Sequence, residues 1–270
     1  MNARLITLTT DFGQEDWFVG VMKGVILTRI PGATIVDVSH GIPPGDVRSG
    51  AFALRAAYRY FPPGAVHVVV VDPGVGSSRR AIAAQAQDCF FVAPDNGVIS
   101  PALAQAGTTS VRQITRTSLF LQPTSRTFHG RDVFAPVAAF LADGGAFDTL
   151  GPEIADYVRL PLPGPVRTEH GWEGEVEYCD RFGNAITNIP NEWIAGANGW
   201  QLELAGGSRY AIGGCYSDVG EGEVVGVPGS SGFLEIAVRN GNAARVLGLS
   251  VGSIVRVFAG GETVNRHGGD

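Results

Sequence analysis

The chain has 270 residues, which is enough for one large or two modest domains, each with its own hydrophobic core. Hydrophobic residues make up 44% of the chain and charged residues 17%, a globular composition that excludes an intrinsically disordered protein. The formal net charge of −6 argues against nucleic acid or an anionic membrane as a partner, because proteins that bind such surfaces present a basic stripe.

The first part of the chain alternates short β-rich runs with helical patterns. Residues 5–9 are typical of a strand, residues 17–30 place apolar side chains on a helical stripe, and residues 34–38 form the next strand. Asp46 is suited to cap a helix that continues to Tyr58.

The valine-rich run at 66–71 predicts a central strand, because a parallel strand covered on both faces is mostly apolar along its length. Two strand segments at 80–84 and 89–92 follow as a pair, with helices near 100–105 and 132–141. This order predicts an α/β sheet whose ligand binds outside the carboxyl ends of the strands.

A proline-rich stretch at residues 160–165 marks a change in composition. After it come short strands separated by Gly, Asn and Asp, and only residues 243–247 have a helical pattern. We therefore predict an N-terminal α/β/α sheet domain at residues 1–160, a linker at 161–169 and a small C-terminal β-barrel domain at 170–270.

Cysteine usage and the N-terminus predict the compartment. Cys89, Cys179 and Cys215 are widely spaced and odd in number, which predicts neither a disulfide framework nor a zinc site. The N-terminus leads directly into the first strand without the apolar stretch of a signal peptide. No apolar run approaches the roughly 20 residues that span a bilayer. We expect a cytoplasmic protein that does not contact membranes.

Loops after the predicted strands hold the polar residues that suggest a function. Asp11 and Asp16 follow the first strand, where a carboxylate can accept hydrogen bonds from both hydroxyls of a ribose; alternatively, they only cap turns and a helix. Asp72 ends the apolar strand at a Gly-rich turn that brings Arg79 back toward it; alternatively, this is a phosphate-binding loop or a plain turn. His129 precedes a Gly and a predicted helix start, and its alternative is a structural role.

Two loops of the predicted C-terminal domain combine polar and aromatic residues. One holds Asp180, Phe182 and Asn184, and the other holds Ser230 and Phe233. A phenylalanine can stack on a purine while backbone groups contact the edge of the base. The alternative is that both loops are hairpin turns, which need Gly, Asn and Asp for their backbone conformation.

Six motifs occur in chain order: residues 9–13 (TTDFG), 38–44 (VSHGIPP), 71–76 (VDPGVG), 93–97 (APDNG), 128–132 (FHGRD) and 180–184 (DRFGN). Together they resemble the S-adenosyl-L-methionine (SAM) hydrolase family, also called the SAM hydroxide adenosyltransferases, which are relatives of the fluorinase and chlorinase. The resemblance covers nearly the whole chain. It implies an N-terminal α/β domain, a C-terminal β-barrel and a homotrimer whose active site lies between the N-terminal domain of one subunit and the C-terminal domain of its neighbour.

The resemblance also implies a reaction, the hydrolysis of SAM to adenosine and L-methionine, with no metal or other cofactor. By position, the water-activating set of the family falls on Asp72, Arg79 and His129. The remaining contacts fall on Asp11 for the ribose, on Asp16, Asp180 and Ser230 for the methionine portion, and on Phe182, Asn184, Phe233 and Ala243 for the purine.

The halogenating relatives lack the water-activating set and carry an extra loop in the N-terminal domain. No such insertion stands between Ala81 and Pro94, which favours water over halide. A carboxylate at position 72 would also repel an anion. Ser231 stands where the fluorinase carries an arginine, so the contact to the methionine carboxylate is left unassigned.

The proposed hydrolysis requires correct positioning of a water molecule and no acid catalyst. The sulfonium of SAM departs as a neutral thioether, so no acid is needed to protonate the leaving group. The enzyme must hold a water oxygen in line behind the ribose C5′. We expect Asp72 and His129 to orient this water and accept its proton, with Arg79 holding Asp72.

Three other functions are compatible with the same residues. One is a SAM-dependent, halogenase-type nucleophilic substitution, and another is a non-catalytic sensor of adenosine or SAM. The third is a metal-dependent phosphoesterase that uses Asp11, Asp72, Asp95, His129 and Asp132. No dense ligand spacing such as H-x-H or D-x-D supports the phosphoesterase hypothesis.

Overall fold

The computed structural model describes residues 4–107, 109–194 and 199–259 of the chain. The chain forms two compact units, Met1–Pro161 and Leu162–Asp270, which are the N-terminal and C-terminal units below. Within the described ranges, no helix combines the length and the apolar composition needed to cross a membrane.

A six-stranded sheet forms the centre of the N-terminal unit. In spatial order its strands are β2 (Thr34–Ser39), β1 (Leu5–Thr10), β3 (Val66–Val70), β5 (Cys89–Pro94), β4 (Ala81–Ala86) and β6 (Thr109–Gln113). The first four strands run parallel, whereas β4 is antiparallel to both of its neighbours. Every residue of β3 is buried, as its valine-rich sequence predicts for a central parallel strand.

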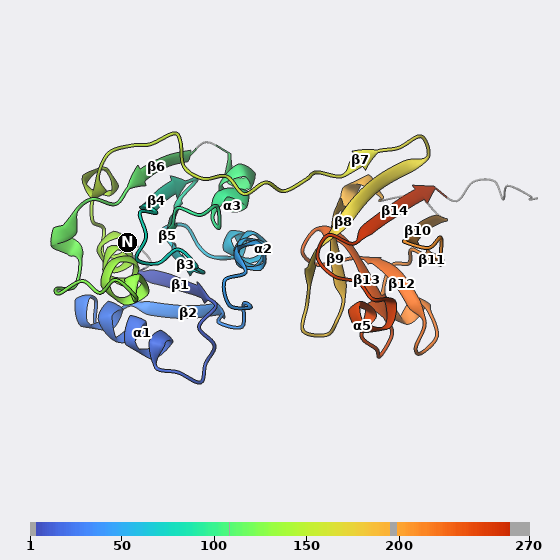
Figure 1. The fold of residues 1–270 in the computed structure, drawn as a ribbon, viewed down its shortest axis with the longest axis horizontal. Coiled ribbons are helices and arrows are strands. Elements are labelled where there is room, and N and C mark those ends of the chain that lie inside the picture. Colours follow the sequence, from blue (N-terminus) through green and yellow to red (C-terminus); the bar gives the residue numbers. More distant parts are fainter. Residues whose placement is uncertain (1–3, 108, 195–198, 260–270) are drawn as a thin grey trace, which may run out of the picture. The chain divides into compact units, whose positions relative to one another are not determined.

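Two pairs of helices cover the two faces of this sheet (Figure 1). One face carries α1 (Phe18–Arg29) and α4 (Ala135–Ala142), and the other carries α2 (Val47–Ala57) and α3 (Ser100–Ala106). Successive side chains of β3 alternate between the two cores, with Val68 and Val70 in the first and Val69 in the second. The Asp46 carboxylate accepts a hydrogen bond from the Ser49 N–H at 3.0 Å, so Asp46 caps α2 as predicted.

Shorter helical turns connect these elements. The 3₁₀ turns are η1 (Tyr58–Tyr60), η2 (Thr117–Leu119) and η4 (Phe147–Leu150) in the N-terminal unit, and η5 (Asn191–Trp193) and η6 (Tyr216–Asp218) in the C-terminal unit. A π-helical turn, η3 (Gly130–Phe134), leads into α4. The helix expected at residues 132–141 therefore begins two residues earlier, directly after His129. Such π-turns are rare and frequently lie at functional sites.

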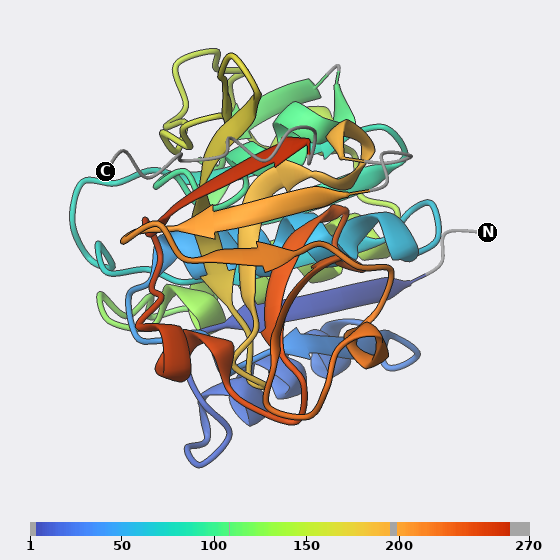
Figure 2. The ribbon, with the colours of Figure 1, turned by 90° about the vertical axis from the view of Figure 1, so that its right-hand side faces the viewer.

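An eight-stranded antiparallel sheet that closes toward a barrel forms the C-terminal unit (Figure 2). Its strands are β7 (Val166–Arg167), β8 (Gly171–Cys179), β9 (Ala185–Pro190), β10 (Trp200–Leu204), β11 (Arg209–Ala211), β12 (Val224–Pro228), β13 (Phe233–Val238) and β14 (Ile254–Ala259). The order is β11-β10-β14-β8-β9-β13-β12, with β7 paired to β8. A bridge between Ile212 and Gly226 joins the two ends of that order. The helix α5 (Ala243–Leu247) follows β13.

The predicted fold class is confirmed: an α/β sheet unit precedes a small, nearly barrel-shaped β unit. Strands β6, β7, β9, β11 and β12 were not predicted. The sequence of β12 contains Gly226 and Pro228, and both residue types are depleted in strands. In β9, the polar side chains of Thr187 and Asn188 are accommodated because each donates to a backbone carbonyl, at 2.9 Å and 2.8 Å.

A buried histidine lies at the centre of the first sheet. His67 in β3 is fully buried, and its Nδ1 lies 2.8 Å from the hydroxyl of Thr7, its register partner on β1. The rings of Tyr58, Phe61 and Phe91 surround it, with centroids 5.2–6.2 Å away. Burial in this apolar setting lowers the pKa of His67 from 6.5 to about 4.

We predict that His67 makes the N-terminal unit sensitive to acid. The folded pKa lies below the unfolded value of 6.5, so the unfolded chain takes up the proton first as the pH falls. The contribution of His67 to stability is complete above pH 6.5 and is lost as the pH falls to about 4, by about 3 kcal/mol. Urea unfolding followed by helical circular dichroism measures this, since α1 to α4 belong to the N-terminal unit.

In His67→Gln the side chain can still bond to Thr7 but does not titrate, so we expect a flatter pH dependence in that range. His170→Gln changes an exposed histidine of the other unit and should keep the wild-type slope. Equal slopes in His67→Gln and wild type would contradict the prediction.

Candidate active site

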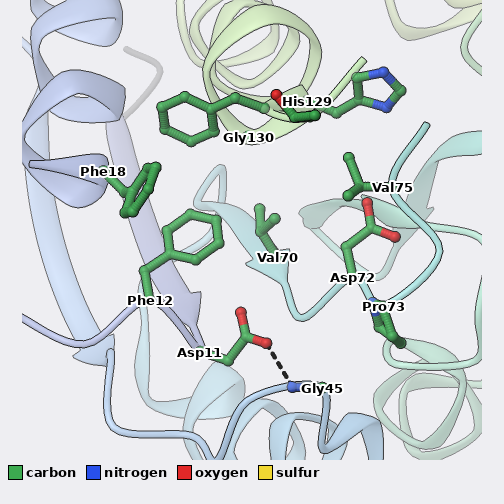
Figure 3. A pocket seen from close by; sticks show the side chains of 12 residues that line it. Asp11, Phe12, Phe18, Gly45, Val70, Asp72, Pro73, Val75, His129 and Gly130 are labelled. Carbon is green, nitrogen blue, oxygen red and sulfur yellow. Dashed lines mark hydrogen bonds between the residues drawn. The ribbon is translucent and has the colours of Figure 1, made fainter. Parts of the chain in front are cut away.

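A cavity of about 340 Å³ opens in the N-terminal unit at the carboxyl ends of β1 and β3 (Figure 3). These strands are parallel neighbours, and Thr10 lies opposite Val70. Asp11 and Asp72 follow these two residues, so both carboxylates emerge at one edge of the sheet. Twelve residues line the cavity: Asp11, Phe12, Phe18, Gly45, Val70, Asp72, Pro73, Val75, Thr127, Phe128, His129 and Gly130.

Arg79 joins Asp72 to His129. Its Nε donates to Asp72 Oδ1 at 2.9 Å, and its Nη2 contacts Asp72 Oδ2. The same Nη2 lies 2.7 Å from His129 Nδ1. The side chains of Asp72 and Arg79 are only 5% and 10% exposed, so this bidentate pair is shielded from water. The structure therefore brings together the three residues assigned to water activation, with the arginine between the other two.

The Gly-rich loop between Asp72 and Arg79 is held against the segment that precedes His129. Gly76 has a φ of +78°, and a Cβ at this position would lie 2.4 Å from the backbone oxygen of Arg126. Only glycine satisfies both restraints. The Arg126 guanidinium donates back to the Gly76 carbonyl at 3.3 Å. This contact between the two loops helps to place Arg79 beside His129.

The hydrogen bond from Arg79 determines the protonation of His129. A guanidinium only donates, so Nδ1 of His129 accepts, and the proton of the neutral ring is on Nε2. Burial, followed by the charge of Arg79, lowers the pKa of His129, although Asp72 and Asp132 oppose the shift. His129 is consequently a neutral imidazole at pH 7.

Asp132 supports the segment that carries His129. Its side chain is 1% exposed and accepts hydrogen bonds from Arg131 at 2.6 and 2.9 Å. It also accepts a hydrogen bond from the Ser125 N–H at 2.7 Å. Asp132 thus ties the start of η3 to residue 125, four positions before His129. This carboxylate was considered as a metal ligand in the phosphoesterase hypothesis, and the structure gives it a structural role.

The opposite wall of the cavity combines Asp11 with aromatic rings. Asp11 Oδ2 accepts a hydrogen bond from the Gly45 N–H at 2.7 Å. The other oxygen of Asp11 points into the cavity (Figure 3). The rings of Phe12, Phe18 and Phe128 pack on one another with centroids 5.2–5.9 Å apart. The cavity therefore has carboxylates beside an apolar surface, a combination suited to an organic cation.

Phe12 and Phe128 were not assigned a role from the sequence, although each lies inside a quoted motif. Their signal was available as aromatic residues next to Asp11 and His129. Asp16, in contrast, is exposed in the loop between β1 and α1 and does not line the cavity.

In the C-terminal unit, Asp180, Phe182, Asn184 and Ala243 lie together. Asp180 accepts hydrogen bonds from the backbone and side-chain amides of Asn184, at 2.9 and 3.1 Å. Phe182, between them, is 79% exposed. The turn is held to the start of α5, where Ala243 is buried, by a 2.8 Å bond from the Ala244 N–H to the Gly183 carbonyl. An exposed aromatic ring thus stands beside an ordered amide.

Ser230 and Phe233 do not join that group directly. They belong to the hairpin between β12 and β13, and Phe233 pairs with Pro190 at the end of β9 that is distant from Asn184. The separation along β9 is five residues, or about 16 Å at a strand rise of about 3.3 Å per residue. Ser230 is exposed, whereas the hydroxyl of Ser231 is buried and makes no hydrogen bond within the described part of the chain.

Tyr216 lies near both C-terminal loops and was missed in the sequence. It is 46% exposed, and its hydroxyl donates to Glu235 Oε1 at 2.5 Å. Burial and this bond raise the pKa of Tyr216 to about 12. Burial also raises the pKa of Glu235, with a further contribution from Asp180. An isolated tyrosine in a Gly-rich loop offered no spacing that would have marked it.

Three of the four acids of the phosphoesterase hypothesis pair with arginines. Asp72 pairs with Arg79, Asp95 accepts a hydrogen bond from Arg80 at 2.7 Å, and Asp132 pairs with Arg131. In the described ranges, no three His, Cys, Asp or Glu side chains are grouped so as to hold a metal ion. The guanidinium on each of these three carboxylates opposes a second cation there.

Comparison with known proteins relates both units to one family. A family model described as the SAM hydroxide adenosyltransferase N-terminal domain matches residues 6–151. A second model, for the C-terminal domain of the same family, matches residues 174–256. The two matches correspond to the α/β unit with the cavity and to the β unit.

Individual relatives are similar along almost the whole chain. A protein of Thermus thermophilus named (R)-S-adenosyl-L-methionine hydrolase is 42% identical, over 94% of this chain and 100% of its own length. A Salinispora tropica protein of the same name is 40% identical, over 94% and 98%. The crystal structure of an uncharacterized conserved protein from Thermotoga maritima superposes with a TM-score of 0.89 at 38% identity, over 94% of this chain and 99% of that one.

Proposed function

Since the chain belongs to the SAM hydroxide adenosyltransferase family, we propose that it is an enzyme that hydrolyses SAM to adenosine and L-methionine. The observation that carries this proposal is the Asp72–Arg79–His129 cluster beside a cavity that also holds Asp11. The relatives' name specifies (R)-S-adenosyl-L-methionine, and we propose the same epimer as the substrate of this protein. Halogenation and phosphate-ester hydrolysis are not favoured by these relatives.

In the proposed reaction, a water oxygen attacks the ribose C5′ from the side opposite the sulfonium. The C5′–O bond forms as the C5′–S bond breaks, and the electron pair of that bond leaves with the sulfur of methionine. The water loses one proton, so the products are adenosine, L-methionine and a proton. Holding the reactants in line can contribute roughly 7–11 kcal/mol in favourable cases.

We propose a separate task for each residue of the cluster. Both Asp72 oxygens accept from Arg79 but retain further lone pairs, so this carboxylate is the acceptor that can orient the water and take its proton. His129 is neutral, with Nδ1 committed to Arg79, and so holds the guanidinium in place. This refines the expectation that Asp72 and His129 both face the water. The reaction as proposed needs no metal, because the leaving group is neutral and a carboxylate is available as the base.

We assign the remaining residues by the chemistry of their positions. The free lone pairs of Asp11 would accept the ribose hydroxyls, while Phe182 would stack on the purine and Asn184 and Ala243 would contact its edge. We propose Phe233 as a second purine contact, as the family resemblance implies. Asp16, Asp180 and Ser230 would contact the methionine portion.

We further propose a homotrimer in which one subunit's N-terminal unit and a neighbour's C-terminal unit form each site. The proposal is supported by the division of candidate residues between two separate units, with Asp11 and Asp72 in one and Phe182 and Asn184 in the other. We also propose a cytoplasmic location, which is consistent with three free cysteines.

Incubation with SAM in halide-free buffer tests the proposed function. We expect adenosine and methionine in equal amounts by chromatography, with and without a chelator, and faster consumption of the (R) epimer. Full loss of activity in the chelator, restored by zinc or magnesium, would contradict the metal-independent scheme. The appearance of a halogenated nucleoside in place of adenosine when chloride is added would favour the halogenase alternative.

A second prediction separates catalysis from binding. Asp72→Ala and His129→Ala should lower kcat by roughly 10²–10⁴-fold with little change in SAM affinity, because Asp72 accepts the proton of the water and His129 holds the Arg79 that positions Asp72. The double variant should be little worse than either single one. In the wild type, kcat should fall on the acid side with a midpoint below 6.5, since protonated His129 would face Arg79 as a second cation.

Asp156→Ala is the matched control, because this exposed acid pairs with Arg80 outside the cavity and should leave both constants unchanged. His129→Ala with the kcat of the wild type would remove His129 from the proposed machinery.

The shared site predicts complementation between inactive variants. Asp72→Ala and Asn184→Ala subunits, co-expressed with different tags, should assemble sites with both wild-type halves. Random assembly draws each half independently, so about a quarter of the sites should be intact. Activity no higher than that of the two variants separately, or a fully active monomer by light scattering, would refute the shared site.

A further inference from the structure

Four polar side chains that the site does not use, Thr10, His40, Asp37 and Lys23, contact one another in series from the buried end of β1 to the partly exposed Lys23. His40 is 2% exposed, and its Nδ1 lies 2.8 Å from the hydroxyl of Thr10, which is fully buried at the end of β1. Its Nε2 lies 3.0 Å from Oδ1 of Asp37, and Lys23 on α1 donates to the other Asp37 oxygen at 2.6 Å. The proposed reaction uses none of these four side chains.

We propose that His40 and Thr10 are positioning residues that hold the Asp11 carboxylate in its ribose-binding orientation, an inference that rests on the proposed function. The order Thr–His–Asp is also that of hydrolytic triads. Here the threonine is fully buried, so its hydroxyl cannot reach a substrate. The Thr10–His40–Asp37 series instead holds the backbone next to Asp11 in place.

The contacts of Thr10 and His40 surround Asp11. The Phe12 N–H donates to the Thr10 hydroxyl at 3.2 Å, so this hydroxyl spans the residue between them. The Gly13 N–H donates to the His40 carbonyl at 2.9 Å. The backbone directly after Asp11 is therefore bonded to the Thr10 hydroxyl and to the His40 carbonyl.

The same segment also reaches the Asp11 side chain. Five residues after His40, the Gly45 N–H donates to Asp11 Oδ2 at 2.7 Å, the bond drawn in Figure 3. Residues 40–45 thus hold both the backbone and the carboxylate of Asp11. A shift of His40 would move the partner of Asp11 as well as the loop that carries it.

Hydrogen-bond donors and acceptors are consistent along this series of contacts. Because the Thr10 oxygen accepts from Phe12, its own proton is available for His40 Nδ1. His40 then carries its proton on Nε2, which lies at ion-pair distance from Asp37 Oδ1 without the geometry of a regular hydrogen bond. Burial opposes ionisation of Asp37, but its contacts with Lys23 and His40 outweigh this and lower the pKa of that carboxyl. The series of contacts thus ends at the Asp37–Lys23 ion pair near the surface, and this pair fixes the ring of His40.

The same strand provides a matched control. Thr7 is also fully buried on β1, and its hydroxyl also lies 2.8 Å from a histidine Nδ1, that of His67. Thr7→Val and Thr10→Val therefore each remove a histidine-bonded hydroxyl from equivalent burial, and Thr10→Val also removes the acceptor of the Phe12 N–H. Only Thr10 contacts the loop of Asp11.

The experiment compares SAM kinetics and thermal stability of the wild type, Thr10→Val, Thr10→Ser and Thr7→Val. We expect Thr10→Val to raise KM about tenfold with kcat within about twofold of the wild type, the loss of roughly one hydrogen bond. Thr10→Ser restores the hydroxyl and should return KM toward the wild-type value. Thr7→Val should lower stability at unchanged KM. If Thr10→Val does not fold, Asp37→Asn, at the partly exposed end of the series, should raise KM in the same direction.

A double-mutant comparison decides whether Thr10 acts through Asp11. Thr10→Val should add nothing to the KM of Asp11→Ala if it only positions that carboxylate. Additive effects, an unchanged KM in Thr10→Val, or an equal rise in Thr7→Val would overturn the inference. Calorimetric binding of adenosine repeats the comparison without turnover. A wild type that binds adenosine but does not hydrolyse SAM would overturn the proposed reaction alone, and the role of Thr10 and His40 would then be judged by the adenosine Kd.

Discussion

The arrangement of the site depends on the guanidinium of Arg79, which bonds to Asp72 on one side and His129 on the other. This single group links a loop after β3 to a loop before η3, two segments about fifty residues apart that share no strand pairing. A lysine could not replace it, because only the planar guanidinium offers donors in several fixed directions. The charge has a second effect, since it adds to burial in lowering the pKa of His129 and keeps that ring neutral.

The sheet places these loops before any side chain acts. In parallel strands the carboxyl ends meet at one edge, so Asp11 and Asp72 become neighbours although sixty residues separate them. The valines of β3 are buried on both faces, which leaves little freedom in the position of the strand end. Helix packing therefore determines where Asp72 lies, and the Gly-rich loop with Gly76 determines how Arg79 returns to it.

The Asp72–Arg79–His129 set came from the family resemblance, whereas the sequence pattern was sufficient for the fold class, because apolar runs mark the strands. It could not show that Arg79 lies between the other two, since that depends on a contact between two loops. It also missed the role of Asp132, whose burial is set by η3. In the C-terminal unit, the antiparallel pairing of β9 with β13 places the loop of Phe182 and the loop of Ser230 at opposite ends of β9. Such pairing joins segments that are distant in the sequence and leaves no local pattern.

Three histidines of the N-terminal unit show that position, and not residue type, distinguishes function. In each, Nδ1 meets a polar side chain at 2.7–2.8 Å: Thr7 for His67, Thr10 for His40 and Arg79 for His129. His67 is enclosed by aromatic rings, where a charge is expensive, so it stabilises the sheet as a neutral group. His40 is equally inaccessible, but it contacts Thr10, the residue next to the cavity-lining Asp11. Its effect on the site must therefore pass through the backbone around Asp11. Only His129 lines the cavity itself. The same side chain thus contributes to stability, to positioning or to chemistry according to what separates it from the carboxylates at the strand ends.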